Sequence, residues 1–184
     1  MYHKPVRFDP IKPGGLRLLT LGEINLASSL FDFSIHYNQV WIHRGSYLPF
    51  NLQDNLTAMT PNGEVWFQEG IYEDDFSMPL RDRVGQQHLF LHEMMHVWQK
   101  QRGMWVKTRG IFSWAADYSY SLDKCSLADY SMEQQACIVS DYWLFKTYGF
   151  YQNSYLNKLR DYNPSQHDGT LLDNYKQVLG NFPS

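Results

Sequence analysis

The sequence is short of three things: an excess of charge of one sign, long apolar runs and cysteine. Its formal net charge is −3, and no run of lysine and arginine exceeds two residues, so the basic surface of a nucleic-acid-binding domain is not expected. No apolar stretch approaches the roughly 20 residues that a membrane-spanning helix requires. These absences predict a soluble domain that neither binds nucleic acid nor inserts into a membrane.

The two cysteines, Cys125 and Cys137, are too few for a disulfide framework, and we expect two buried free thiols. The first residues are polar and contain proline, without the apolar centre of a signal peptide. Residues 1–15 are therefore interpreted as an extended arm or a linker remnant, and residues 16–184 as a single domain. Such a domain either stays in the cytosol or is exported by a dedicated machine.

What the sequence does contain is a composition typical of a folded domain. Hydrophobic residues make up 43% and aromatic residues 16% of the 184 residues, which allows a substantial core. Periodicity, capping patterns and turn signals predict helices over 21–32, 82–103, 127–148 and 170–179, and strands over 39–43 and 63–72. This order predicts an α+β domain in which a small sheet packs beside a long helix.

The long predicted helix contains the pattern His-Glu-x-x-His at His92, Glu93 and His96. Histidines four residues apart lie one turn apart on the same helix face, so both rings can reach one zinc ion at about 2.0–2.1 Å. Glu93 lies on a neighbouring side, where it can take a proton from a water at the metal. Buried histidine and glutamate side chains are costly without partners, so the apolar flanks favour a metal over two satisfied core histidines.

A catalytic zinc has three protein ligands, so one more residue must complete the site. The metzincin pattern requires a histidine where Arg102 stands, which excludes that subclass. Our choice is Glu133, the last glutamate of the chain, near the start of a predicted second helix. Its alternative role is that of a solvated acid favoured by the helix dipole. The other candidate ligands are His167, Asp117, Asp123, Asp129 and Asp141.

Other polar side chains are supporting candidates. Asp129 and Asp141 are candidates to orient a ligand histidine through its second ring nitrogen. His88 lies one turn before His92, and we expect it at the rim of the cleft. The candidates to stabilise a developing oxyanion are His167, Tyr118, Tyr120 and Tyr130.

The stretch Val65-Trp66-Phe67 has two interpretations. It is either an ordinary buried strand or the sheet edge that binds an extended peptide by strand addition.

Three segments, residues 63–67, 89–99 and 133–136, resemble a bacterial group of zincins. Its members include peptidase domains at the C-termini of Vgr-type and Rhs-type proteins of type VI secretion. The resemblance implies a zincin-like fold with gluzincin character and an antibacterial toxin that acts in the periplasm of a target bacterium. It also implies a secretion spike protein and a cognate immunity protein as partners.

Carried over residue by residue, the resemblance implies zinc ligands at His92, His96 and Glu133, with Glu93 as the base. One residue departs from the pattern. Cys137 stands where many gluzincins have an aspartate that orients the first histidine, so the hydrogen-bond partner of that histidine is open.

The predicted reaction is hydrolysis of a peptide or amide bond in a protein or peptide substrate by a zinc-activated water. A first alternative is a zinc amidase that cuts peptidoglycan stem peptides. A second, from a different class, is a catalytically silent binding module that keeps zinc for structure. Glu93 argues against the second, because a purely structural site has no use for a general base.

Overall fold

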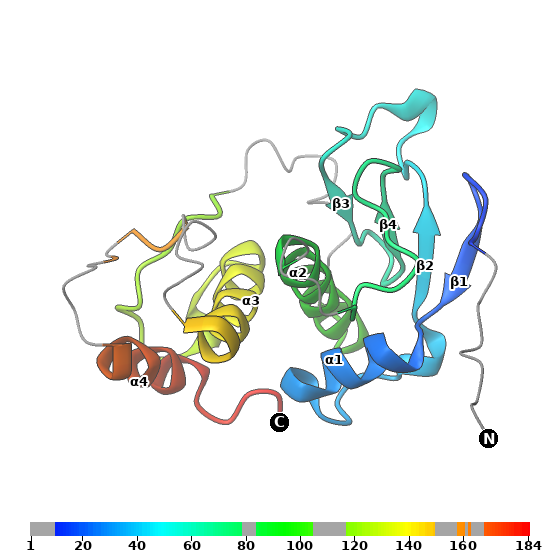
Figure 1. The fold of residues 1–184 in the computed structure, drawn as a ribbon. Helices are drawn as coiled ribbons and strands as arrows, with labels where there is room; N and C mark the ends of the chain where they lie inside the picture. The colour runs from blue at the N-terminus through cyan, green and yellow to red at the C-terminus, as the bar shows by residue number, and fades with distance from the viewer. Residues whose placement is uncertain (1–9, 79–83, 105–116, 150–157, 161, 163–167) are drawn as a thin grey trace, which may run out of the picture.

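The computed structural model describes residues 10–78, 84–104, 117–149, 158–160, 162 and 168–184. In these residues an α+β architecture is observed, as predicted (Figure 1). The helices are α1 (Leu21–Phe31), α2 (Val84–Gln101), α3 (Met132–Tyr148) and α4 (Asp168–Leu179), with short 3-10 helices at Tyr37–Gln39, Pro49–Asn51 and Leu127–Asp129. The strands are β1 (Leu16–Leu18), β2 (Trp41–Arg44), β3 (Ala58–Met59) and β4 (Val65–Phe67).

The sheet is small and mixed. Its strand order is β1-β2-β4-β3, with β2 and β4 parallel and both outer pairs antiparallel. β1 and β3 were not predicted, because two or three residues are too few to show an alternating pattern. β4 has a strand on either side, so the interpretation of Val65–Phe67 as a peptide-binding edge is wrong. The free edges belong to β1 and β3.

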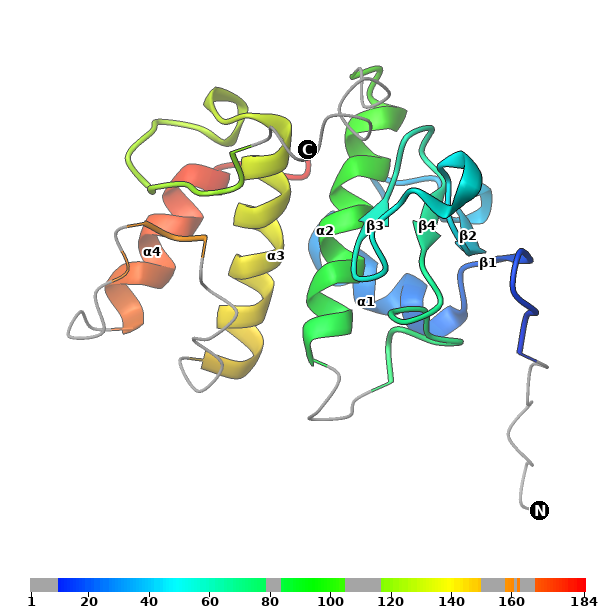
Figure 2. The ribbon, with the colours of Figure 1, turned by 90° about the horizontal axis from the view of Figure 1, so that it is seen from above.

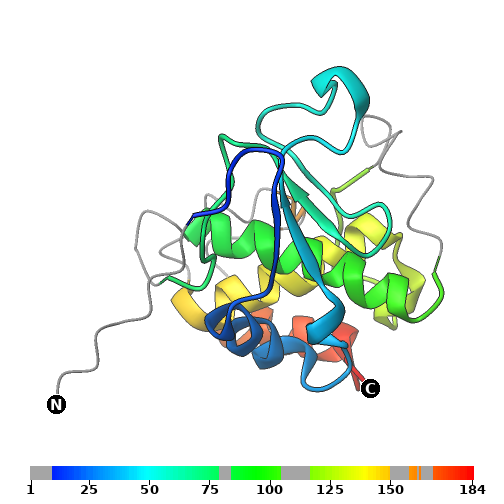
Figure 3. The ribbon, with the colours of Figure 1, turned by 90° about the vertical axis from the view of Figure 1, so that its right-hand side faces the viewer.

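Helix α2 lies between the sheet and α3 (Figures 1 and 2), and Figure 3 shows α2 and α3 behind the sheet. Ile42, Val65 and Phe67 of the sheet and Phe90 and Met94 of α2 are fully buried. Because α2 is covered from two directions, several of its polar side chains are buried, namely Gln87, Glu93, His96 and Gln99.

The helix boundaries follow local hydrogen bonding. α1 begins as predicted, since the Thr20 hydroxyl accepts from the backbone N–H of Glu23 and the Glu23 carboxylate accepts from the N–H of Thr20. The helix predicted over 127–148 is divided, because Ser131 is extended and caps α3 by accepting from the N–H of Gln134. α3 ends at Gly149, where φ is +67°, a conformation that favours glycine.

Both cysteines are free, but only Cys137 is buried, whereas Cys125 is exposed. The expectation of two buried thiols is therefore wrong for Cys125, which belongs to the loop segment ahead of α3. None of the helices in the described ranges is long and apolar enough to span a bilayer.

Candidate metal centre

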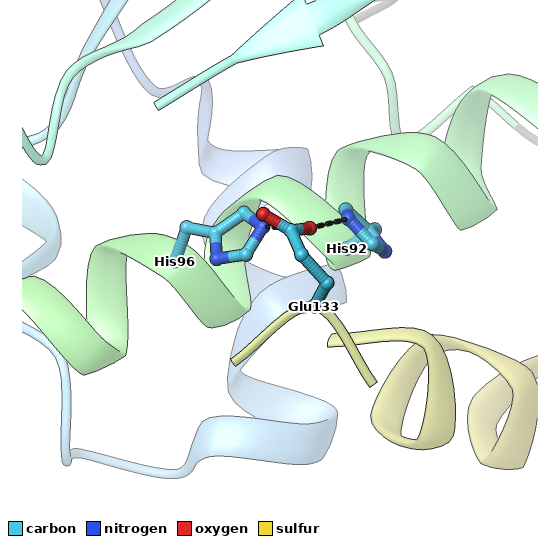
Figure 4. Close-up of side chains that lie close together, drawn as sticks. All are labelled: His92, His96 and Glu133. Carbon is cyan, nitrogen blue, oxygen red and sulfur yellow. Dashed lines mark hydrogen bonds and ion pairs between the residues drawn. The ribbon is translucent and has the colours of Figure 1, made fainter. Parts of the chain in front are cut away.

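His92, His96 and Glu133 lie together between α2 and α3 (Figure 4). The two rings project from one face of α2, and Glu133 comes from the first turn of α3. One carboxylate oxygen, Oε2 of Glu133, lies 3.1 Å from Nε2 of His96 and 3.5 Å from Nε2 of His92. The one-turn spacing places the two histidines together, and the packing of α3 on α2 brings Glu133 to them, although Glu133 is 37 residues after His96 in the sequence.

The three groups fit a zinc ion. Two imidazole nitrogens and one carboxylate oxygen are the ligand set of a catalytic zinc, which leaves one coordination position for water or substrate. Ligand atoms about 2.0–2.1 Å from a tetrahedral ion lie about 3.3 Å from one another, and the observed separations of 3.1 and 3.5 Å lie on either side of that value. The residues present are therefore suited to hold this metal.

Charge couples the same groups. Burial lowers the pKa of His96, but the hydrogen bond and charge of Glu133, helped by Glu93 and Gln99, outweigh it and raise that pKa to about 9. Burial raises the pKa of Glu133, but hydrogen bonds and charges from His92 and His96 hold it well below its usual range. In metal-free protein the proton of His96 therefore supplies the positive charge beside the Glu133 carboxylate that a metal ion would otherwise supply.

The outer partner of His96 is Gln99, which was not predicted from the sequence. Its Oε1 lies 2.8 Å from Nδ1 of His96, and its Nε2 donates to the backbone oxygen of Met132. This fixes the ring so that Nε2 points toward Glu133, a common role for the residue that contacts the second nitrogen of a ligand. The only sequence signal was its position three residues after His96, on the same side of α2.

The outer partner of His92 is Cys137, whose sulfur lies 3.9 Å from Nδ1 of the ring. Cys137 thus stands beside the first histidine, at the position where the resemblance would have an aspartate. Burial, with the charges of Asp141 and Glu133, raises the pKa of Cys137, so the group is a neutral thiol and a weaker partner than a carboxylate.

Glu93 is buried with 4% of its surface exposed, and its Oε2 accepts a hydrogen bond from the Thr60 hydroxyl at 2.6 Å. Thr60 follows β3 and was not predicted. Glu93 and His92 line a cavity of about 430 Å³ together with Tyr118 and Cys137. The predicted base therefore faces a space that a substrate can enter.

Tyr118 is the one tyrosine of the three predicted that lies at this cavity. Its ring centroid is 6.2 Å from that of His92. Tyr120 is instead buried and bonded to Asp141 and Tyr175. Tyr130 donates to the backbone oxygen of Ser121, which leaves it a structural role.

The predicted aspartates are not beside the ligand histidines. Oδ1 of Asp141 lies 2.6 Å from Nε2 of His88, and Asp129 caps a 3-10 helix by accepting from Ser126. Asp117 pairs with Arg160 on the surface, and Asp123 is exposed. His88 lines the cavity, and His167 lies outside the described residues.

The fold and site define a class of α+β domain in which a His-His-Glu cluster joins two packed helices beside a small sheet. No known protein-family profile matches the sequence. The chain is 39% identical over 103 residues to the type VI secretion system spike protein VgrG2b of Pseudomonas aeruginosa. That alignment covers 55% of this chain but only 10% of the relative's length.

The solved effector domain of Pseudomonas aeruginosa VgrG2b is similar over most of both chains. The TM-score is 0.62 at 36% identity, and the match covers 78% of this chain and 83% of that domain. The chain belongs to the family of the VgrG2b effector domain.

Proposed function

We propose that the chain is a zinc-dependent peptidase that serves as a type VI secretion effector domain. The observation that carries the proposal is the arrangement of His92, His96 and Glu133 around one point, with Glu93 in the cavity that His92 also lines. Glu93 distinguishes this site from a structural zinc site, because a second acid that faces a cavity has no role in holding a metal closed in by protein.

Zinc, when bound, supplies a Lewis acid that polarises a carbonyl and lowers the pKa of water. Glu93 accepts the proton of the attacking water and passes it to the nitrogen of the scissile bond, so that the carbon–oxygen bond forms and the carbon–nitrogen bond breaks. Thr60 holds Oε2 of Glu93, which assigns the proton transfer to Oε1.

Tyr118 is the group that stabilises the developing negative charge. Burial, and then the charges of Glu133, Glu93 and Cys137, raise the pKa of Tyr118, so its hydroxyl keeps its proton at neutral pH. A protonated hydroxyl beside the cluster is a donor for the oxyanion of an amide-bond transition state.

The effector role rests on the family. The solved relative is an effector domain, and the longer relative is a secretion spike protein. By extension, the chain is carried by a spike into a rival bacterium, acts in the target periplasm, and is neutralised at home by an immunity protein. Expression of the domain with a periplasmic signal sequence should slow bacterial growth, whereas cytosolic expression should be mild. Equal toxicity in both compartments would remove this part of the proposal.

The enzymatic part is tested by metal content and hydrolysis together. Wild-type protein reconstituted with zinc should hold one ion per chain and should be screened on casein and on peptidoglycan, which separates a protein substrate from stem peptides. Glu133→Ala should lose at least about 100-fold in zinc affinity, since even partners of ligands are worth 10–100-fold.

Glu69→Ala is the matched control, because Glu69 is a surface glutamate with 56% of its side chain exposed. It should keep both the metal and the activity. A Glu133→Ala variant that still binds zinc with wild-type affinity would show that another residue is the third ligand.

A further inference from the structure

A second set of polar residues lies at the cavity but outside the metal cluster. The cavity beside Glu93 is also lined by two basic side chains, His88 and Lys158, and by apolar groups. The apolar residues are Leu56, Ala58 and Leu89. Hydrolysis of an amide bond by the cluster and Glu93 requires neither of the two basic residues, so their position needs a separate explanation.

His88 is held in place by a buried network. Its Nε2 lies 2.6 Å from Oδ1 of Asp141, and the other oxygen of Asp141 accepts from the Tyr120 hydroxyl at 2.6 Å. That hydroxyl lies 2.6 Å from the hydroxyl of Tyr175. Asp141 is 1% exposed and Tyr175 is fully buried. The carboxylate therefore orients the imidazole from behind and does not itself face the cavity.

The same network holds the backbone of Lys158. The backbone N–H of Tyr120 donates to the carbonyl of Lys158 at 2.9 Å, and the N–H of Arg160 donates back to Tyr120 at 2.8 Å. Tyr120 thus joins the two basic residues, through its backbone to one and through its hydroxyl and Asp141 to the other. The buried Tyr120 therefore fixes the imidazole of His88 through Asp141 and the backbone of Lys158 directly, whereas the side chain of Lys158 is exposed at the cavity.

The charge of Lys158 has no partner of opposite sign among the described residues. Its ammonium lies 5.7 Å from the centre of the Tyr118 ring, and no described carboxylate pairs with it. Glu93 is the one acid among the residues that line the cavity. A dication at the cluster would leave one positive charge after Glu133, and Glu93 balances that charge. The side chain of Lys158 is exposed, so a carboxylate that enters the cavity would meet an ammonium with no carboxylate partner among the described residues.

We propose that this cavity is a subsite for a carboxylate of the substrate, with Lys158 as the counter-charge and His88, oriented by Asp141, as a polar wall. The inference rests on the proposed peptidase function and names its substrate class: peptides that carry a carboxylate close to the scissile bond. The carboxylate belongs either to an acidic side chain or to a chain terminus, and the apolar residues of the cavity contact the carbon atoms that bear it.

The test measures binding without turnover. Zinc-loaded Glu93→Gln protein is titrated with two pairs of acetylated tetrapeptides by calorimetry. One pair differs in glutamate against glutamine, and the other in a free against an amidated C-terminus. The carboxylate member of at least one pair should bind about twofold to fivefold more tightly, the range expected of an exposed ion pair. The pair that responds identifies the source of the carboxylate.

Substitutions at Lys158 then assign the preference. In the same background, Lys158→Met should abolish the difference between the members of the pair, and Lys158→Arg, which keeps the charge, should retain it. Lys146→Met is the control, because Lys146 is an exposed lysine on α3 that does not line the cavity. It removes one positive charge without touching the subsite and should leave the preference intact.

Two results would overturn the subsite: no preference in either pair, or a preference that survives Lys158→Met. If the surviving preference disappears when zinc is removed, the carboxylate binds the metal. The activity itself is judged separately with wild-type protein. Hydrolysis without a carboxylate preference rejects the subsite alone, whereas a Lys158-dependent preference without any hydrolysis rejects the peptidase proposal and keeps the subsite.

Discussion

Two buried glutamates, Glu23 of α1 and Glu133 of α3, have very different surroundings. Glu23 is fully buried and accepts from both terminal nitrogens of Arg17, each at 2.7 Å. The backbone N–H groups of Thr20 and Phe76 donate to it as well. Glu133 is 9% exposed, and its Oε2 lies 3.1 and 3.5 Å from the Nε2 atoms of two imidazoles.

The difference separates a structural carboxylate from a functional one. A guanidinium never loses its proton at accessible pH. Burial lowers the pKa of Arg17, but its interactions with Glu23 and Tyr72 outweigh burial and raise that pKa above its ordinary value. The charge of Glu23 is therefore matched permanently. Imidazole is a metal ligand in its neutral form, so the two partners of Glu133 can hold a metal ion beside the carboxylate.

The sharpest test of the functional region is Glu93→Gln, for which we expect the largest effect. The amide is nearly the same size as the carboxylate and can still accept from Thr60, so the fold and the metal site should persist. It cannot take a proton, and general-base catalysis is worth about 10²–10⁴ in rate. Hydrolysis should fall by that factor while zinc content and melting temperature stay near wild type. Loss of zinc in this variant would instead make Glu93 a structural residue.

The corresponding test of the structural region is Arg17→Met. It leaves Glu23 buried without its counter-charge, which costs about 3–5 kcal/mol of folding stability. Urea denaturation should show this loss, and the folded fraction should still bind zinc, because Arg17 contacts neither α2 nor α3 through any described interaction. Adding Glu23→Leu should recover part of the stability. An Arg17→Met variant that keeps its stability but loses zinc would show that the pair of Arg17 and Glu23 supports the metal site and not the fold.

A smaller effect is expected from Gln99→Ala, which removes the partner of Nδ1 of His96. Zinc affinity should fall by about 10–100-fold, measured by competition with a chelator. Gln101→Ala, two residues further along α2, removes a hydrogen bond to the backbone of His36 and should leave zinc affinity unchanged. Equal losses in the two variants would point to general loosening of the helix.

The smallest effect is a change of about one proton. The pKa of His96 in the metal-free protein is about 9, so at pH 7 the ring is protonated and must release its proton when zinc binds. Calorimetry in two buffers of different ionisation enthalpy should detect this release, which should vanish above about pH 9.

The same raised pKa also affects stability without metal. A pKa above the unfolded value of about 6.5 contributes stability that is complete below that pH and is lost as pH rises through about 9. The free energy of unfolding of metal-free protein, measured by urea denaturation, should therefore fall over this window. The contribution of the ion pair between Arg17 and Glu23 should stay constant over the same window. A flat profile would contradict the ion pair between His96 and Glu133.

The sequence by itself determined the features that depend on a few neighbouring residues. The cap at Thr20, the stop at Gly149 and the pairing of His92 with His96 follow from hydrogen bonds and side-chain directions within about four residues. Those rules hold whatever the rest of the chain does, because helical geometry is the same in every context. The α+β class followed in the same way from the order of such local patterns.

Only the tertiary structure decided which distant groups meet. In the folded chain Glu133 lies beside the histidines, Asp141 contacts His88 and neither candidate ligand histidine, and the Thr60 hydroxyl donates to Glu93. Residues tens of positions apart share no local pattern that encodes their distance. Their contacts depend on how α3 and the sheet pack against the two sides of α2, which is a property of the whole core.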